Sequence, residues 1–293
     1  MRLTVLLGCL IALPLAACQK QEDADLKKQE PPVFEREVSA MRLYVFDCGH
    51  FEIADMNAYD SSGAQNGKPG SLVNTCFMVR HPKGDLVWEA GIPDKIESAP
   101  DGVVSGGYKM TLPKTLKGQL DRIGVPPRAV EYFAVADFNA DHVGNANLFK
   151  DSTFILSERA RDAMFGADAK KDAANYASYA DLEATKKATF ADSYDVFGDG
   201  SAIVISMPGP KPGHAALFIN LPHTGPLLLS GDLFYTQEGR ANRAIPTFNN
   251  DAAATRQSFD AFEQIADQGG ARVIVEHDPD DFEKLPRAPA YLD

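Results

Sequence analysis

The sequence is short of positive charge, of tryptophan and of phosphate-binding loops. Of its 293 residues, 29 are Lys or Arg and 41 are Asp or Glu, which gives a formal net charge of -12. A nucleic-acid binder needs a basic face that replaces the counterions of the phosphates, so this balance argues against one. A single Trp offers no stacking platform for single strands. The chain also lacks a Walker loop and a Gly-x-Gly-x-x-Gly after a strand, which are the usual phosphate-binding motifs. It has no Gly-x-Ser-x-Gly elbow either, so serine-hydrolase chemistry is not indicated.

The apolar run closest to the N terminus, residues 3–15, is too short to span a bilayer. It follows Arg2 and ends in Leu15-Ala16-Ala17-Cys18, a tetrad that resembles the bacterial lipobox, in which the Cys carries the lipid and becomes the new N terminus. We therefore expect a lipoprotein signal peptide over residues 1–17 and a lipidated Cys18 that anchors the chain to the membrane. An ordinary secretory signal with an incidental Cys is the alternative.

The residues after Cys18 bear on location and on where the fold begins. By resemblance to known sorting rules, Gln19 favours the outer membrane of a bacterial cell envelope, facing the periplasm or the surface. Residues 18–40 are polar, with Pro31-Pro32, and are typical of a flexible tether. The folded domain is expected over residues 41–293.

Cys48 and Cys76 form a candidate pair if the chain is exported to an oxidising compartment. They fall at the end of one predicted strand, 42–47, and at the start of another, 75–80. Antiparallel pairing would bring them close enough for a disulfide. Two buried free thiols are the alternative, and the one that the residues favour.

Strands and helices alternate along the predicted domain. Several strands are apolar throughout, as in sheets that are covered on both faces. Helical stripes occur around Leu120 and Phe262, and a third helix is expected from Ser157. This order predicts an α/β sandwich, and the polar, Gly-rich residues 55–73 predict a long loop. The predicted strands span 42–47, 75–80, 85–89, 129–136, 153–157, 202–207, 215–220, 227–230 and 273–276.

Acidic and imidazole groups gather at the ends of these predicted strands. The run Asp137-Phe138-Asn139-Ala140-Asp141-His142 follows an apolar strand, and Asp232 and His277 follow two others. Loops at strand ends are where α/β folds place ligand sites. His214 follows a Pro- and Gly-rich turn, and Tyr235 comes three residues after Asp232.

In order and spacing, these stretches resemble the metallo-β-lactamase superfamily, and most closely its N-acyl homoserine lactonase group. The resemblance covers about residues 41–293. It implies an αββα sandwich with metal bound at one edge. The stretches that carry it are residues 42–49, 81–84, 144–149, 225–232 and His277-Asp278.

The family's metal-ligand signature is only partly present. Where the family has His-x-His-x-Asp-His, this chain has Asp137-x-Asn139-x-Asp141-His142, and Pro210 stands where the next His ligand would be. The three altered positions are the terminal ligands of the family's first metal, so the resemblance implies a degenerate first site. The set for the second metal is complete and comprises Asp141, His142, the bridging Asp232 and His277.

The expected cofactor is one divalent metal per chain. Zn²⁺ accepts nitrogen and oxygen donors and is the favoured ion, and a carboxylate-rich site also suits Mn²⁺ or Fe²⁺. Asp137 and Asn139 carry oxygen donors for a possible weak second site. His214 is expected beside the ligands, as a second-shell or buried hydrogen-bonding His, rather than among them.

Structural alternatives stay open for the site residues. Asp141 and His142 could cap the following helix, Asp232 could be a turn residue, and His277 could be bonded to backbone at a strand end. In the lactonases a Tyr at the offset of Tyr235 helps to polarise the substrate carbonyl, and a Tyr that only packs is the alternative.

Two functions from different classes remain. The favoured one is a lipid-anchored, metal-dependent hydrolase of lactones or esters, in which Asp141 or Asp232 takes a proton and Tyr235 stabilises the oxyanion. The alternative is a non-catalytic lipoprotein of the same fold that acts as a binding or scaffolding module. The exchange of three ligands, one of them for Pro, is what a relaxed demand for catalysis would produce.

Overall fold

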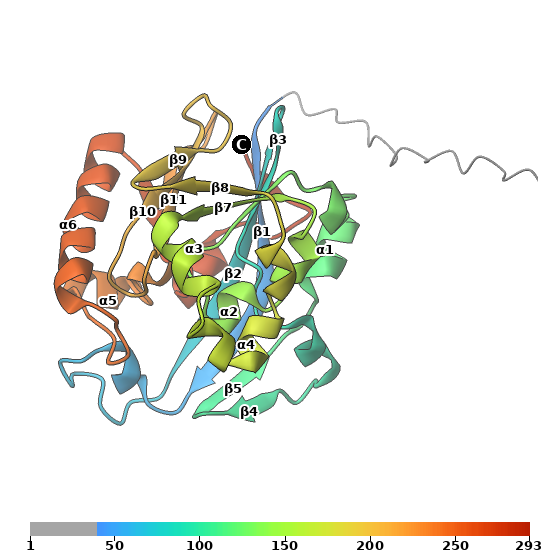
Figure 1. Ribbon diagram of the computed structural model, residues 1–293. Helices are drawn as coiled ribbons and strands as arrows, with labels where there is room; N and C mark the ends of the chain where they lie inside the picture. Colours follow the sequence, from blue (N-terminus) through green and yellow to red (C-terminus); the bar gives the residue numbers. More distant parts are fainter. Residues whose placement is uncertain (1–39) are drawn as a thin grey trace, which may run out of the picture. The chain divides into compact units, whose positions relative to one another are not determined.

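The computed structural model describes residues 40–293 (Figure 1). The predicted signal peptide, the lipidated Cys18 and the tether, except for its last residue, lie outside the described residues. Among residues 40–293, none of the helices is both long and apolar enough to cross a membrane.

Two β-sheets form the centre of the domain. The larger sheet has the strand order β4-β5-β1-β2-β3-β6-β7-β8, with β14 also paired to β1, and the smaller one has the order β13-β12-β11-β10-β9. The strands are β1 (Arg42–Ile53), β2 (Gly70–His81), β3 (Gly84–Trp88), β4 (Val103–Ser105), β5 (Tyr108–Thr111), β6 (Tyr132–Ala134), β7 (Thr153–Ser157), β8 (Lys187–Phe190), β9 (Ser193–Asp195), β10 (Ala202–Ser206), β11 (Ala215–Leu221), β12 (Gly225–Leu229), β13 (Arg272–Ile274) and β14 (Tyr291–Leu292).

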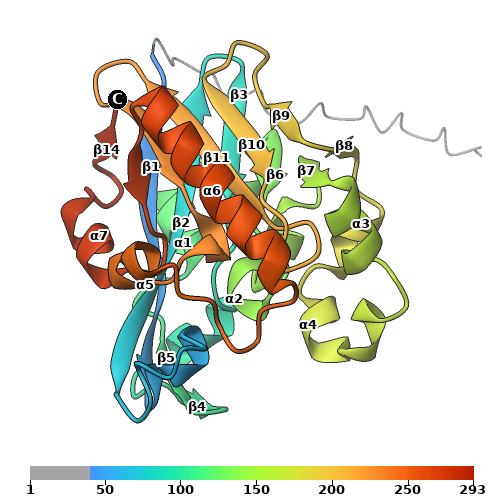
Figure 2. The same cartoon turned by 90° about the vertical axis from the view of Figure 1, so that its left-hand side faces the viewer.

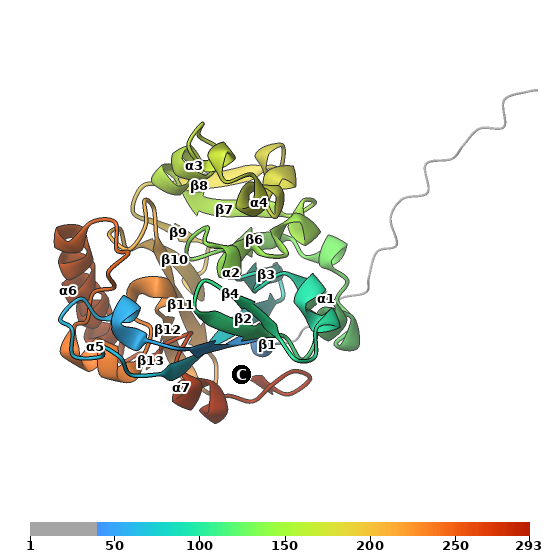
Figure 3. The same cartoon turned by 90° about the horizontal axis from the view of Figure 1, so that it is seen from below.

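Helices cover the outer faces of both sheets, so the layers run helix, sheet, sheet, helix (Figure 3). The longest, α6, lies along the outside of the smaller sheet (Figure 2). It begins where Asp251 accepts the backbone N–H groups of residues 253 and 254, and it buries Phe259 and Phe262. The α-helices are α1 (Leu116–Arg122), α2 (Ala140–Val143), α3 (Glu158–Met164), α4 (Ala173–Ala177), α5 (Gln237–Asn242), α6 (Ala252–Gly269) and α7 (Pro279–Lys284).

The alternation of side chains along the central strands builds two cores from one sheet. In β1, Leu43 and Val45 face the smaller sheet, where they join one buried cluster with residues such as Leu217 of β11. The intervening Tyr44 and Phe46 face outward and join a second cluster with Leu120 of α1. The larger sheet is therefore apolar on both faces, as the sequence predicted.

Most predicted elements are present, and the main differences concern the first two strands and the strand predicted over residues 129–136, which is shortened to β6. β1 continues to Ile53 and β2 begins at Gly70, so the loop predicted over residues 55–73 is shorter by its last residues. The hairpin of β4 and β5 was not predicted, because the three residues of β4 are all exposed and carry no alternating pattern.

Cys48 and Cys76 form a disulfide, with their Cα atoms 5.8 Å apart. The interpretation as two free thiols, which the sequence favoured, was therefore wrong. Cys76 pairs with Phe46, two residues before Cys48, and the pairing of β1 and β2 is irregular between Asp47 and His50, where Cys48 lies. Both cysteines join the buried cluster on the outer face of the larger sheet.

Candidate metal centre

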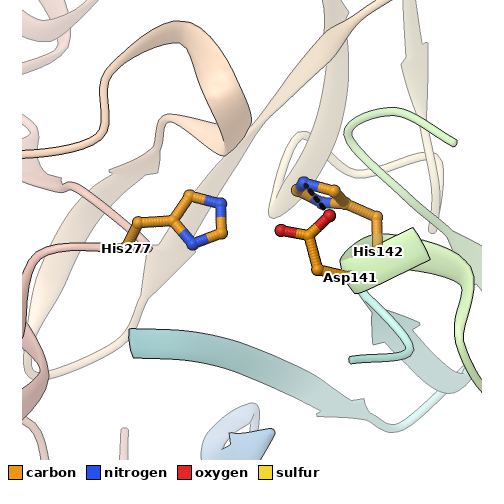
Figure 4. A group of neighbouring side chains, drawn as sticks. All are labelled: Asp141, His142 and His277. Atoms are coloured by element: carbon orange, nitrogen blue, oxygen red, sulfur yellow. Dashed lines mark ion pairs between the residues drawn. The ribbon is translucent and has the colours of Figure 1, made fainter. Parts of the chain in front are cut away.

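The predicted site residues meet where the carboxyl ends of two parallel strand pairs face each other across the sandwich. In the larger sheet, β3 and β6 are parallel, and they are followed by Glu89 and by the run from Asp137. In the smaller sheet, β12 and β13 are parallel, and they lead to Asp232 and His277. Figure 4 shows Asp141 and His142 on α2, with His277 pointing at them from the C-terminal segment.

Both imidazoles are held by their outer nitrogens. The Nδ1 of His277 lies 2.8 Å from the carbonyl oxygen of Val73, which can only accept, so Nδ1 carries a hydrogen. The Nδ1 of His142 lies 2.7 Å from the Glu89 carboxylate. The two Nε2 atoms then face one oxygen, Oδ1 of Asp232, at 3.1 Å from His142 and 2.8 Å from His277. Outer acceptors that fix the tautomer in this way are typical of metal-binding histidines.

The second oxygen of Asp232 has different neighbours. The hydroxyl of Tyr235 donates to Oδ2 at 2.6 Å, and the side-chain amide of Asn139 donates to it at 3.4 Å. Asp137 lies between the two sides, with its Oδ1 4.0 Å from Nε2 of His142 and its Oδ2 3.4 Å from the amide nitrogen of Asn139. Asp232 therefore presents one oxygen to imidazoles and the other to hydrogen-bond donors.

The donor set fits one divalent ion on the imidazole side. One ligand atom each from Asp141, His142 and His277 lie within 4.8 Å of one another, and Oδ1 of Asp232 lies against both imidazoles. Two nitrogens and two carboxylate oxygens are a donor set that Zn²⁺ accepts. Asp137, His142 and Asp232 form a second, overlapping group of the same kind. The four predicted ligands are thus brought together, and their role as ligands stays a prediction.

The charges of the cluster depend strongly on one another. Burial alone would lower the pKa of His277, but the hydrogen bond and the charge of Asp232 raise it to about 9. Burial raises the pKa of Asp137 to about 7, against the opposing effect of His142. Burial would also raise the pKa of Asp232, yet His142 and His277 hold it well below its usual value. The same carboxylate that would bind a metal thus favours protons on the imidazoles, so metal and protons compete for this place.

Glu89 supports the site and was not singled out from the sequence. Its other oxygen accepts the backbone N–H of Ala136 at 2.6 Å, so one buried carboxylate fixes both His142 and the strand that leads to it. Glu89 has a φ of 73°, a conformation that a non-glycine residue rarely adopts and that costs about 1–3 kcal/mol. The signal available in the sequence was an acid that directly follows the apolar strand 85–88.

Glu276 was missed as well. Its carboxylate accepts the indole N–H of Trp88 at 3.1 Å and the backbone N–H of Gly231 at 2.7 Å. It thereby ties together the segments that carry Asp232 and His277. Nothing in the sequence distinguished this acid from Asp278, which caps α7.

Helix α2 is clamped to the segment after β3. The side chain of Asn145 donates to the carbonyl oxygens of Ala90 and Ile92, and the N–H of Gly144 donates to Gly91. A Cβ at position 144 would stand 2.4 Å from the Gly91 oxygen, so the close approach requires glycine there. His142 and Glu89 are held in register by this contact.

His214 and Pro210 each make a hydrogen bond with a backbone group. His214 is fully buried and donates from Nδ1 to the carbonyl of Met207, as expected of a His beside the ligands; burial lowers its pKa to about 4. Its Nε2 finds no hydrogen-bond partner among the described residues. The carbonyl of Pro210 accepts the N–H of Asn250, which ties this residue to the start of α6.

The alternative roles for the site residues can be compared with the contacts. Asn139, not Asp141, stands at the N-cap of α2, and no side chain caps that helix. His277 is indeed bonded to a backbone carbonyl, but this bond uses Nδ1 and leaves Nε2 facing Asp232.

A cavity of about 310 Å³ opens above Asp141 and Asp232. Tyr59, from the loop between β1 and β2, packs its ring 4.7 Å from that of Tyr235, so this loop forms part of the wall. The lining is mainly aromatic and aliphatic, and it contains no Lys, Arg or His. It consists of Phe51, Tyr59, Ile92, Pro93, Tyr108, Met110, Asn139, Ala140, Asp141, Asp232, Tyr235 and Phe248.

Curated proteins that resemble this chain in sequence include N-acyl homoserine lactonases. The N-acyl homoserine lactonase AttM of Azorhizobium caulinodans is 28% identical over 262 residues, which are 86% of this chain and 99% of the relative. An N-acyl homoserine lactonase of Bacillus thuringiensis is 22% identical over 234 residues, 76% of this chain and 90% of the relative. No protein-family model matches the chain.

Solved structures with the same fold include lactonases and a hydrolase of the β-lactamase superfamily. A quorum-quenching N-acyl homoserine lactone hydrolase superposes with a TM-score of 0.72 at 21% identity, covering 87% of this chain and 99% of its own. AidC, a dizinc quorum-quenching lactonase, gives 0.61 at 13% identity, with 82% and 88% covered. The hydrolase AbOPH, described as a member of the β-lactamase superfamily, gives 0.58 at 14% identity, with 87% and 92% covered. The chain thus has the metallo-β-lactamase fold and is similar in sequence to N-acyl homoserine lactonases over most of its length, which confirms the predicted resemblance and fold class and supports the expected hydrolase of the lactonase type.

Proposed function

We propose that this protein is a lipid-anchored hydrolase of lactones or esters that uses one divalent metal ion, most simply Zn²⁺, with Mn²⁺ or Fe²⁺ as alternatives. The ligands would be Asp141, His142, Asp232 and His277. The observation that carries the proposal is the pair of imidazoles whose outer nitrogens are fixed and whose Nε2 atoms converge on Asp232. Lactonase relatives that align with nearly the whole domain support the reaction class.

A divalent ion bound by these residues would lower the pKa of water and polarise the acyl carbonyl of the substrate. The chain's own residues then take separate roles. Asp141 lines the cavity and is the most exposed of the four ligands, with 28% of its side chain accessible, so it is the better placed carboxylate to take a proton from water. Tyr235 lines the same cavity and can turn its hydroxyl from Asp232 to a developing oxyanion.

The cavity bears on the choice of substrate. Apolar rings and aliphatic side chains form its walls, and its charged lining residues, Asp141 and Asp232, are both acids. A substrate with an apolar acyl group would bury that group against these walls. Apart from the proposed metal ion, the lining offers a substrate carboxylate no positive charge and two acids, so we expect neutral lactones and esters to be preferred.

The proposed location rests on Cys18 and Gln19 in the sequence: a lipoprotein of the bacterial cell envelope that carries its lipid on Cys18 and lies in the outer membrane. Strand β1 separates the start of the described domain from the cavity. Arg42 starts β1, and Phe51, which lines the cavity, lies nine residues farther along the same strand, or about 30 Å. The cavity therefore opens far from the point where the chain enters the domain, which suits a substrate that diffuses to the site.

The test is the metal content and the activity of the full chain purified in detergent without chelator. We expect about one metal ion per chain, and hydrolysis of neutral lactones or esters that is lost on chelation and restored by Zn²⁺ or Mn²⁺. A chain that takes up no metal even after reconstitution, and hydrolyses none of these substrates, would favour the non-catalytic lipoprotein instead.

A further inference from the structure

Asn139 stands at the start of α2 but does not use its side chain there. At this position an Asn side chain ordinarily accepts a backbone N–H of the first helical turn. In this protein the N-cap makes no side-chain hydrogen bond, and the turn is held by the carbonyl oxygen of Asn139, which accepts from residues 142 and 143. The side chain is therefore free for another partner.

That partner is a pair of buried carboxylates. The Nδ2 of Asn139 lies 3.4 Å from Oδ2 of Asp137 and 3.4 Å from Oδ2 of Asp232. Asp137 and Asp232 are 3% and 2% exposed, so neither can rely on water. An amide NH₂ group has two hydrogens, one for each carboxylate. A neutral donor thus fills the place between two acids where a second metal ion would have to lie.

A second donor engages the same carboxylate. Oδ2 of Asp232 also receives the hydroxyl of Tyr235 at 2.6 Å. Asn139 and Tyr235 thus occupy the two oxygens, Oδ2 of Asp137 and Oδ2 of Asp232, that a second ion would need as ligands. An ion could bind there only if these donors turned away.

We propose that the side-chain amide of Asn139 replaces a second metal ion and, when substrate is bound, turns the hydrogen that it donates to Asp232 toward the carbonyl oxygen of the substrate. Asn139 lines the cavity beside Asp141, so an acyl group held there lies within its reach. When a water oxygen bonds to the acyl carbon, the carbonyl oxygen gains the negative charge and Asn139 stabilises it. The ester C–O bond then breaks, and the leaving oxygen takes up the proton that the water has lost.

The role of Asn139 in catalysis rests on the proposed hydrolase function, but its place between the carboxylates does not. The first experiment therefore counts metal and needs no substrate. Mn²⁺ binding to the full chain is measured by elemental analysis and titration calorimetry for the unaltered protein, for Asn139→Asp and for Asn139→Ala.

The expected stoichiometries are about one for the unaltered protein, about one for Asn139→Ala and about two for Asn139→Asp. The Asp substitution removes both donor hydrogens and supplies a third carboxylate next to Asp137 and Asp232, which is the donor set that Mn²⁺ prefers. Asn220→Asp, at an exposed position of β11, is the matched control and should stay at one. A value of two in the unaltered protein, or of one in Asn139→Asp, overturns the assignment.

The second experiment measures hydrolysis by Asn139→Ala. We expect kcat to fall by about 10²–10³-fold, with little change in KM and in metal content, because the lost hydrogen bond belongs to the transition state. A kcat within twofold of the unaltered protein overturns the catalytic role, and so does loss of the metal together with activity. If the unaltered protein hydrolyses nothing, the proposed function fails, while the metal counts still decide the place of Asn139.

Discussion

The two oxygens of Asp232 divide the site into halves that the same carboxylate serves in opposite ways. On the Oδ1 side, two imidazoles fixed by Glu89 and Val73 present their nitrogens, as ligands for a cation do. On the Oδ2 side, Tyr235 and Asn139 present hydrogens. The candidate ligands and the hydrogen-bond donors therefore lie on different sides of one residue. The Oδ1 half is arranged like a cation site, whereas the Oδ2 half receives hydrogen bonds.

The sharpest way to break this comparison is to remove one residue from each half. We expect His277→Ala to abolish both metal uptake and hydrolysis, because a four-ligand site loses one of its two nitrogens. Asp137→Ala, on the other half, should leave metal content at about one per chain and activity largely unchanged. Elemental analysis and a lactone assay on both variants give the answer. Equal damage by the two substitutions would mean that the halves are not distinct.

Tyr235→Phe tests the hydrogen-bonding half without altering its shape. The ring contacts with Tyr59 and Phe248 remain, while the hydroxyl that donates to Asp232 is lost. We expect kcat to fall by about 10²-fold, because an oxyanion donor is removed, and metal content to stay at one. Steady-state kinetics with the metal content of the same sample is the measurement. If metal is lost instead, Tyr235 supports the ligands rather than the reaction.

The support of the imidazole half can be weakened from outside. Glu89→Gln removes the negative charge that orients His142, and we expect metal affinity to fall by about 10–100-fold, as for outer partners of metal ligands in general. Glu97→Gln, at an exposed position of a surface turn, is the matched control. Competition for the metal ion between each variant and a chelator of known affinity gives the metal affinity of both variants. An unchanged affinity in Glu89→Gln would show that the clamp through Asn145 alone positions α2.

The sequence predicted the imidazole half better than its support. Asp141, His142, Asp232 and His277 were identifiable because each follows an apolar strand and because their order resembles a known family. Glu89 could not be singled out, since its function depends on a buried contact with His142, 53 residues farther along the chain, and on a positive φ that no sequence pattern predicts.

Asn139 illustrates a second limit of the sequence. Its amide oxygen suggested a weak metal ligand, whereas the structure turns the amide nitrogen toward the carboxylates. The disulfide is a third case, because the antiparallel pairing that brings the two cysteines close could be expected from the sequence, whereas the irregular pairing next to Cys48 could not. The fold and the positions of the candidate ligands follow from patterns along the chain, but side-chain direction and strand irregularities are set by packing.

The disulfide allows the finest test of how independent the metal-binding half is from the rest of the fold. Cys48 packs against Gly91, two residues after Glu89, and a Cβ at that position would stand 2.7 Å from Cys48 Cβ. We expect the double variant Cys48→Ala/Cys76→Ala to lower the free energy of unfolding by about 3 kcal/mol, because a loop of 28 residues is no longer closed.

The metal affinity of this double variant should remain that of the unaltered protein, because Asn145 and Gly144 clamp residues 90–92 without the disulfide. Denaturant unfolding and metal titration on the same preparation separate the two effects. A loss of affinity in the folded variant would mean that the disulfide, through Gly91, belongs to the support of Glu89, and the metal-binding half would then extend to the outer core.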